Sequence, residues 1–167
     1  MSKLNLVIAG GGSAGWMAAA MLAKLLGPQL NITLVESSEI ATVGVGEATI
    51  PPIRTFNQVL GIDEAEFLHA TGGTIKLGIE FNHWSGPHSN YLHAFGSIGR
   101  DQGFASFYHY WHRARAEGLA EDFWHYSLNA RAVRADKFAP LTHIANTPLD
   151  GLHYAYHFDA GRYAKLL

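Results

Sequence analysis

A glycine fingerprint near the N-terminus constrains the fold more than any other feature of the chain. Gly10, Gly12 and Gly15 have the spacing G-x-G-x-x-G and follow an aliphatic run, Leu4 to Ala9. An aliphatic run that ends at glycines is typical of a strand buried on both faces of a parallel sheet. The residues from Ala14 to Leu26 contain no proline and are rich in Ala, Leu and Met, so they predict a helix that ends at the following Gly-Pro pair.

A second aliphatic segment, Asn31 to Glu36, predicts the next strand. The order strand, glycine turn, helix, strand is a βαβ unit, which has parallel strands and a right-handed crossover. We therefore predict an α/β fold class, a Rossmann-type domain of which the chain holds the βαβ start of a parallel sheet. Only weak strand candidates follow, so we expect this domain to be incomplete.

The fingerprint predicts nucleotide binding because each of its parts has a mechanical role. Gly10 permits the tight turn, Gly12 lets a pyrophosphate approach the backbone, and Gly15 allows close packing of helix and strand. Glu36, 21 residues after the third glycine, would accept the ribose hydroxyls. A plain glycine turn with a solvated glutamate is the alternative. FAD and NAD share the fingerprint, so it does not identify the cofactor.

The rest of the chain predicts a mixture of short elements. The segment from Ser37 to Pro52 is rich in small residues, with Gly44, Gly46 and a proline pair, which indicates an irregular functional loop. Helices are predicted at Ile53 to Leu60, at Asp63 to Ala70 with Asp63 as a cap, at Ser106 to Gly118, and at Ala155 to Leu167 with a cap near Asp159, and a strand is predicted within Thr74 to Trp84.

Composition excludes several classes of partner. A chain of 167 residues, 48% apolar and 16% charged, is the size of one ordinary domain with a real core. A net charge of −2 gives no electrostatic footprint for nucleic acid and no polybasic membrane segment. The absence of cysteine excludes disulfides and zinc thiolate sites. The first apolar run is too short for a membrane span or a secretory core, so we expect a cytoplasmic protein.

Two longer motifs resemble the flavin-dependent tryptophan halogenases. They are Gly10-Gly-Gly-Ser-Ala-Gly-Trp-Met-Ala-Ala19 and Val43-Gly-Val-Gly-Glu-Ala-Thr-Ile-Pro51. The second matches the strap that lies along the isoalloxazine in that family, so the resemblance implies FAD. It also implies a flavin site made of Gly10, Gly12, Ser13, Ala14, Gly15, Trp16, Glu36, Ser37, Ile40, Val43 and Ala48. Without the resemblance, Ile40 and Val43 are equally well explained as loop anchors in the core.

The same resemblance implies a catalytic lysine and an aromatic substrate site. Lys76, in Gly73-Thr-Ile-Lys76-Leu-Gly-Ile-Glu-Phe81, falls where the family keeps its catalytic lysine. From chemistry alone, a lone lysine in a strand is more often an exposed face residue. His93 and Phe95 match positions whose rings enclose the indole of the substrate. The alternative is that they pack, with Tyr91, on one face of a strand.

For the whole enzyme, the resemblance implies that reduced FAD, oxygen and a halide ion give hypohalous acid, which Lys76 presents to an indole-type substrate. A separate flavin reductase is the implied partner. The family's Trp-x-Trp-x-Ile-Pro motif and catalytic glutamate have no counterpart in these 167 residues, so we expect the N-terminal portion of a halogenase, inactive by itself and without the C-terminal substrate region.

Two alternatives to these expectations remain open. An FAD-dependent monooxygenase or other oxidoreductase would share the glycine fingerprint, and a flavin-binding module without activity would share the shortened chain. His109 and His112 lie three apart on a predicted helix, but no nearby carboxylate or cysteine completes a metal site, so we predict none.

Overall fold

The computed structural model describes residues 3–39, 46–141, 143–147 and 149–167. These residues form two compact units, one of Met1–Lys76 with Ala155–Leu167 and one of Leu77–Tyr154. The length of the chain had predicted one domain. The division arises because the chain leaves the first unit after Lys76 and returns to it only at Ala155, so a single segment forms the second unit.

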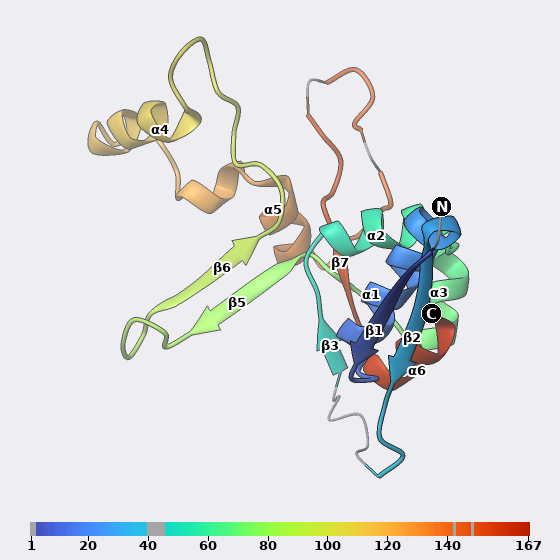
Figure 1. The fold of residues 1–167 in the computed structure, drawn as a ribbon. Helices are drawn as coiled ribbons and strands as arrows, with labels where there is room; N and C mark the ends of the chain where they lie inside the picture. The colour runs from blue at the N-terminus through green and yellow to red at the C-terminus, as the bar shows by residue number, and fades with distance from the viewer. Residues whose placement is uncertain (1–2, 40–45, 142, 148) are drawn as a thin grey trace. The chain divides into compact units, whose positions relative to one another are not determined.

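The first unit begins with the predicted βαβ arrangement. Strand β1 (Leu4–Ala9), helix α1 (Ser13–Leu26) and strand β2 (Leu30–Val35) follow in that order, with a short 3-10 helix η1 (Gly27–Gln29) after α1. The two strands are parallel and in register from Leu4↔Leu30 to Ala9↔Val35, and their arrows run in the same direction in Figure 1. The predicted α/β class with a parallel βαβ start is confirmed.

The prediction that β1 is buried on both faces is wrong for the described residues. Ile8 is partly buried, as are Ile32 and Leu34 on the same face of the two strands. Side chains of the opposite face lie open, with Val7 65% and Val35 54% exposed. A two-stranded sheet that packs against one helix buries only one of its faces, which explains why aliphatic residues alone did not predict the burial.

A second sheet of the first unit joins segments that are far apart in the chain. Its strand order is β3-β7-β4, with β3 (Gly46–Ala48) and β4 (Thr74–Lys76) both antiparallel to the central strand β7 (Ala155–Asp159). Two expectations are corrected here. The loop from Ser37 to Pro52 contains a strand, and the predicted C-terminal helix is a strand over its first five residues, followed by α6 (Ala160–Leu166).

An aromatic cluster packs on one face of this sheet. Phe67, which is fully buried, lies on helix α3 (Glu64–Thr71), and its ring centroid is 4.8 Å from that of Tyr156 and 5.3 Å from that of Phe158 on β7. Tyr163 on α6 completes the cluster, and its hydroxyl donates to Asn57 Oδ1 on helix α2 (Pro52–Leu60) at 2.6 Å. The cluster therefore packs one face of β7 against three helices. The other face of the sheet does not take part in this cluster.

Asp63 is the N-cap that the sequence predicted for α3. Its carboxylate accepts hydrogen bonds from the backbone amides of Ala65 and Glu66 at 2.9 and 3.0 Å. We expect Asp63→Ala to lower the free energy of unfolding by about 1 kcal/mol, because the helix loses its capping acceptor. Urea unfolding measures the change. Glu39→Ala removes the same charge from an exposed position, and an equal loss in this variant would contradict the capping explanation.

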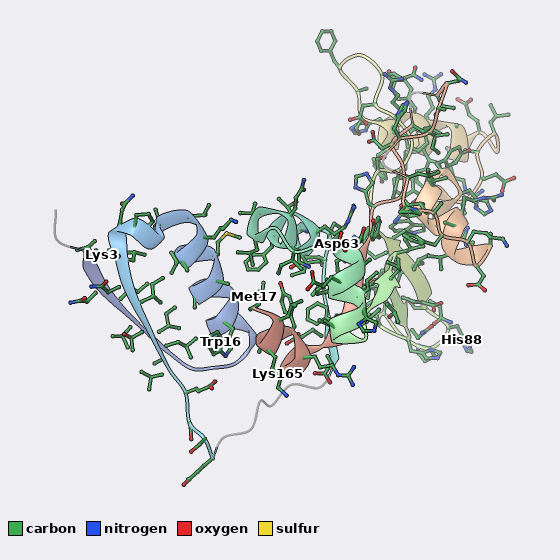
Figure 2. The ribbon with its side chains drawn as sticks, turned by 90° about the vertical axis from the view of Figure 1, so that its right-hand side faces the viewer. Lys3, Trp16, Met17, Asp63, His88 and Lys165 are labelled. Carbon is green, nitrogen blue, oxygen red and sulfur yellow. The ribbon has the colours of Figure 1, made fainter. Side chains whose placement is uncertain are left out.

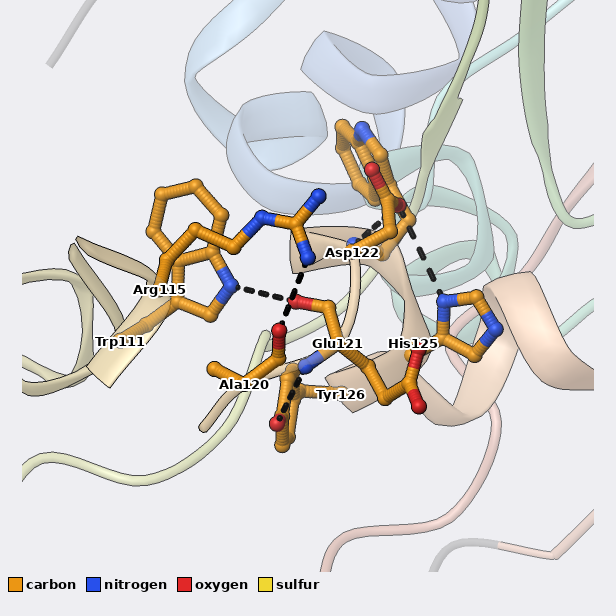
Figure 3. A network of polar contacts seen from close by, with 8 residues as sticks. Trp111, Arg115, Ala120, Glu121, Asp122, His125 and Tyr126 are labelled. Carbon is orange, nitrogen blue, oxygen red and sulfur yellow. Dashed lines mark hydrogen bonds and ion pairs between the residues drawn. The ribbon is translucent and has the colours of Figure 1, made fainter. Parts of the chain in front are cut away.

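The second unit contains a β-hairpin and short helices. The predicted strand from Thr74 to Trp84 is divided, because β4 ends at Lys76 and β5 (Gly78–Asn82) pairs instead with β6 (Asn90–Ala94). Helix α4 (Phe107–Ala116), the 3-10 helix η2 (Phe123–Tyr126) and helix α5 (Leu128–Arg134) follow. Figure 3 shows how polar contacts connect α4 to η2. The Trp111 indole donates to Glu121 O and Arg115 donates to Ala120 O, both at 2.9 Å.

Candidate functional site

The glycine turn between β1 and α1 has the geometry that close backbone approach requires. Gly10 has a φ of +118°, in the region that favours glycine, and its amide donates to Val35 O at 2.8 Å. A Cβ on Gly15 would lie 1.9 Å from Gly10 O, whereas a Cβ on Gly12 would meet nothing within 4 Å. Gly15 therefore closes the turn onto the helix. Gly12 leaves open space in front of the first amides of α1, where an anion such as a pyrophosphate fits.

Glu36 lies against the glycine turn immediately after β2. A Cβ on Gly11 would be 1.7 Å from Glu36 Oε2, so only glycine at position 11 leaves room for this carboxylate. The sequence pattern had not assigned a role to Gly11, which occupies a variable position of the fingerprint. The three consecutive glycines were the available signal.

A cavity of about 680 Å³ opens beside this turn, and its walls come from both ends of the chain. Gly11, Trp16 and Glu36 line one side, and α6 lines the other with Arg162 and Lys165 among its residues. Figure 2 shows Trp16 and Lys165 close to each other. Besides Asp159, which caps α6, the cavity offers a carboxylate for ribose hydroxyls and two cations for phosphates, a set that suits a dinucleotide. The fingerprint could not have revealed the two cations, because α6 is distant from it in the chain.

The remaining predicted flavin residues have different environments. Ser13 Oγ donates to Glu47 Oε1 at 3.0 Å, which connects the start of α1 to β3. Ser37 Oγ accepts from the amide of Glu39 at 3.1 Å. Ala14 is exposed in the first turn of α1. Two further predicted positions, Ile40 and Val43, lie outside the described residues.

Ala48 and Lys76 share one face of the β3-β7-β4 sheet. Ala48 is directly opposite His157 on β7, and His157 is directly opposite Thr74 on β4. Directly opposed residues project to the same face, and so do residues two apart on one strand. Lys76, two residues after Thr74, therefore projects to the same face as Ala48. We call this side of the sheet the open face, because Ala48, His157 and Thr74 are all exposed.

Lys76 itself is buried at the end of the open face. Its side chain is 6% exposed, and the residue opposite it, Ala155, is fully buried. The expectation from chemistry alone, that this strand lysine is exposed, is wrong. The lysine that the family resemblance indicated is buried. Burial penalises the charged form, so it lowers the pKa of the Lys76 ammonium. A buried amine with a lowered pKa is typical of a lysine that does chemistry.

The predicted substrate pair, His93 and Phe95, lies in the second unit. His93 is exposed on β6, with its ring centroid 6.1 Å from that of Trp124. Phe95 follows the end of β6 and is 9% exposed, and its backbone amide donates to Leu77 O at 2.8 Å. The alternative prediction was that Tyr91, His93 and Phe95 pack on one face of a strand. Tyr91 stacks on Phe81, with ring centroids 4.9 Å apart. The two rings therefore differ in accessibility, and Trp124 is an aromatic neighbour that the sequence did not indicate.

Comparison with known proteins decides the family. The tryptophan halogenase family model matches residues 5–167 of the chain. The chain belongs to the tryptophan halogenase family. The resemblance seen in the glycine motif and the Gly-Glu-Ala-Thr-Ile-Pro motif is thereby confirmed.

Solved structures and curated sequences agree with this membership of the tryptophan halogenase family. Xcc4156, a flavin-dependent halogenase from Xanthomonas campestris, is 54% identical with a TM-score of 0.86, and the match covers 99% of this chain and 32% of that one. BrvH, a flavin-dependent halogenase from Brevundimonas sp. BAL3, is 42% identical with a TM-score of 0.84, covering 97% and 32%. Tryptophan 6-halogenase SttH from Streptomyces toxytricini is 34% identical, covering 98% of this chain and 34% of its own length. The chain spans about a third of the length of these relatives.

In this halogenase-family chain, the burial of Lys76 has a measurable effect on stability. Its folded-state pKa lies below the ordinary 10.5, so the unfolded chain binds more protons and stability rises with pH between the two values. We expect Lys76→Met to stabilise the fold near neutral pH and to lose this advantage as pH rises toward 10.5. Urea unfolding at both ends of that range measures the difference. Lys24→Met, on the exposed side of α1, should show no such trend, and a pH-independent effect of Lys76→Met would refute the expectation.

The described residues offer neither a metal site nor a membrane-spanning helix. No group of three or more His, Asp or Glu side chains there is arranged to hold a metal ion. No helix in the described ranges has both the length and the apolar character needed to cross a membrane.

Proposed function

We propose that this chain is the FAD-binding portion of a flavin-dependent halogenase which, as a whole protein, halogenates tryptophan or another indole. One observation carries the proposal: the open face holds both Ala48, from the strap implied to contact the flavin, and the buried Lys76. The same compact unit holds the glycine turn and the cavity beside Glu36. The residues that we assign to the flavin and the lysine with a lowered pKa thus belong to one compact unit, as flavin-dependent halogen transfer to a lysine requires.

We assign groups of this chain to the ribose and the pyrophosphate of FAD. Glu36 is placed for the ribose hydroxyls, and the open space at Gly12 for the pyrophosphate, with Arg162 and Lys165 offsetting its charge. When bound, reduced FAD would supply the electrons for the activation of oxygen, which in turn oxidises a halide ion to hypohalous acid. A separate flavin reductase is the partner that this use of reduced FAD requires.

Lys76 is the residue we assign to the chemical step. A neutral amine can take the halogen of hypohalous acid, and an ammonium can hold the acid by hydrogen bonding. Burial favours the neutral form and excludes water, which limits loss of the oxidant. His93 and Phe95 are the residues we assign to the aromatic substrate, whose orientation decides which carbon is halogenated.

The test uses the natural protein in full, with FAD, a flavin reductase, NADH and chloride or bromide. Tryptophan and indole are supplied in turn, and mass spectrometry follows the products. We expect a halogenated product that depends on both halide and reductase. A hydroxylated product would favour an FAD monooxygenase, which shares the glycine turn and the Glu36 cavity. Absence of FAD binding would overturn the proposal as a whole.

A further inference from the structure

The open face carries a second group that exchanges protons, the imidazole of His157, which no sequence motif indicated. His157 lies in the middle of β7, with Ala48 opposite it on one side and Thr74 on the other. Lys76 pairs with Ala155, two residues before His157 on the same face. Diagonal neighbours of this kind are about 7–8 Å apart at the backbone, within reach of a long side chain and a ring.

Lys76 lies at one end of this diagonal, opposite a small residue. Ala155, directly opposite, offers only a methyl group. Although the His157 side chain is exposed, partial desolvation lowers the pKa of its imidazole, and the nearby Lys76 ammonium lowers it further. The imidazole is therefore neutral near neutral pH, and a neutral imidazole has one ring nitrogen that accepts a hydrogen bond or a proton.

The charged groups near the sheet make their contacts elsewhere. Asp159 shares the face with His157, but its carboxylate accepts from the first turn of α6, at Arg162 N, at 2.8 Å. Glu47 projects to the opposite face, where it accepts from a serine of α1. Glu64 of α3 accepts from a tyrosine hydroxyl behind β7 and lies 3.8 Å from Arg54 of α2. His157 and Lys76 interact electrostatically.

We propose that His157 is the positioning residue for Lys76, accepting a hydrogen bond from its amine group and taking up the proton that the ammonium must lose before halogen transfer. This inference rests on the proposed function for the transfer itself. The central strand β7 then has a role in the reaction as well as in the fold.

The proton transfer and the halogen transfer need no further reagent. The Lys76 ammonium gives one proton to the His157 imidazole, and the resulting amine attacks the halogen of hypohalous acid. A nitrogen–halogen bond forms as the oxygen–halogen bond breaks, and the leaving hydroxide takes the proton from His157 to become water. Lys76 then carries the halogen, and His157 is again neutral and ready for the next cycle.

The first experiment needs neither flavin nor turnover. In the full natural protein with ring-labelled histidine, NMR follows the titration of His157, which is assigned by its loss in His157→Gln. Lys76→Met removes the ammonium that disfavours the imidazolium, so we expect the pKa of His157 to rise toward its ordinary 6.5. Lys24→Met, far from the open face, should leave the titration unchanged. An unchanged titration in Lys76→Met would overturn the proposal.

The second experiment separates a proton-accepting role from a structural one. We compare His157→Leu with His157→Gln, which keeps a hydrogen-bond acceptor, and with His69→Leu, a matched change at an exposed helix position. With FAD, reductase and halide, we expect His157→Leu to lower halogenated product at least tenfold while hypohalous acid, captured by a phenol trap, still forms. His157→Gln should recover part of the loss and shift the acidic limb of the pH profile.

The two proposals fail in different ways. If no hypohalous acid reaches the trap in the unsubstituted protein, the halogenase proposal fails, whatever His157 does. If the acid forms and His157→Leu halogenates as fast as the unsubstituted protein over the whole pH range, the role of His157 is overturned and the halogenase proposal stands.

Discussion

Lys76→Met should lower the halogenated product of the full protein at least a hundredfold, a loss within the usual range of about 10²–10⁴ for a group that handles a proton in the reaction. Methionine keeps the volume and the apolar stem of the side chain, so the buried position stays filled. FAD affinity should change little, because the glycine turn and the Glu36 cavity are formed by other residues. Product yield by mass spectrometry and FAD titration by fluorescence measure the two effects.

Lys24→Met is the matched control for this prediction. Lys24 is exposed in the last turn of α1, away from the open face, so the substitution removes a lysine of the same unit without touching the site. Its product yield should equal that of the unsubstituted protein. Halogenation that survives in Lys76→Met, or that falls equally in Lys24→Met, would remove Lys76 from the chemical step.

Gly15→Ala and Gly12→Ala should separate the two roles of the glycine turn. A Cβ at position 15 would lie 1.9 Å from Gly10 O, a backbone atom. We expect Gly15→Ala to lower the free energy of unfolding by about 3 kcal/mol or more, because the turn and the helix must move apart. At position 12 a Cβ meets nothing, so Gly12→Ala should cost only about 1 kcal/mol through a poorer helix cap. It should nevertheless weaken FAD binding at least tenfold, because the methyl group occupies the space left for the pyrophosphate.

Urea unfolding and FAD titration of each variant test this pair. Gly27→Ala is the control, because Gly27 has a helical φ of −47° and a Cβ there meets nothing within 4 Å. It should leave FAD binding unchanged, with a small loss of stability because Pro28 disfavours the helical conformation for a preceding residue that carries a Cβ. If Gly12→Ala binds FAD as well as the unsubstituted protein, the pyrophosphate does not lie over Gly12.

Local patterns in the sequence were sufficient for the elements that depend on near neighbours. The βαβ start followed from an aliphatic run, glycines at fixed spacing and a helix without proline, and its strand and helix boundaries agree closely with the structure. The caps at Asp63 and Asp159 followed in the same way, since each carboxylate accepts from an amide two or three residues ahead. Interactions over so few residues leave a direct trace in the order of side chains.

The family motifs determined a different part of the site. They indicated Lys76 and Ala48 as functional positions, although chemistry alone favoured an exposed lysine. Only the tertiary structure shows that Lys76 is buried and that it pairs with Ala155 of β7, a strand that follows the second unit in the chain.

Pairing between distant segments decided the rest. The pattern from Ala155 to Leu167 resembled one helix, because an antiparallel partner that lies far away in the chain leaves no local signal for a strand. The pairing of β7 with β3 and β4 brings His157 beside Lys76, and the turn into α6 brings Arg162 and Lys165 to the cavity at Glu36. The sequence by itself thus determined the family and the βαβ start, while contacts between distant segments decided which side chains share a site.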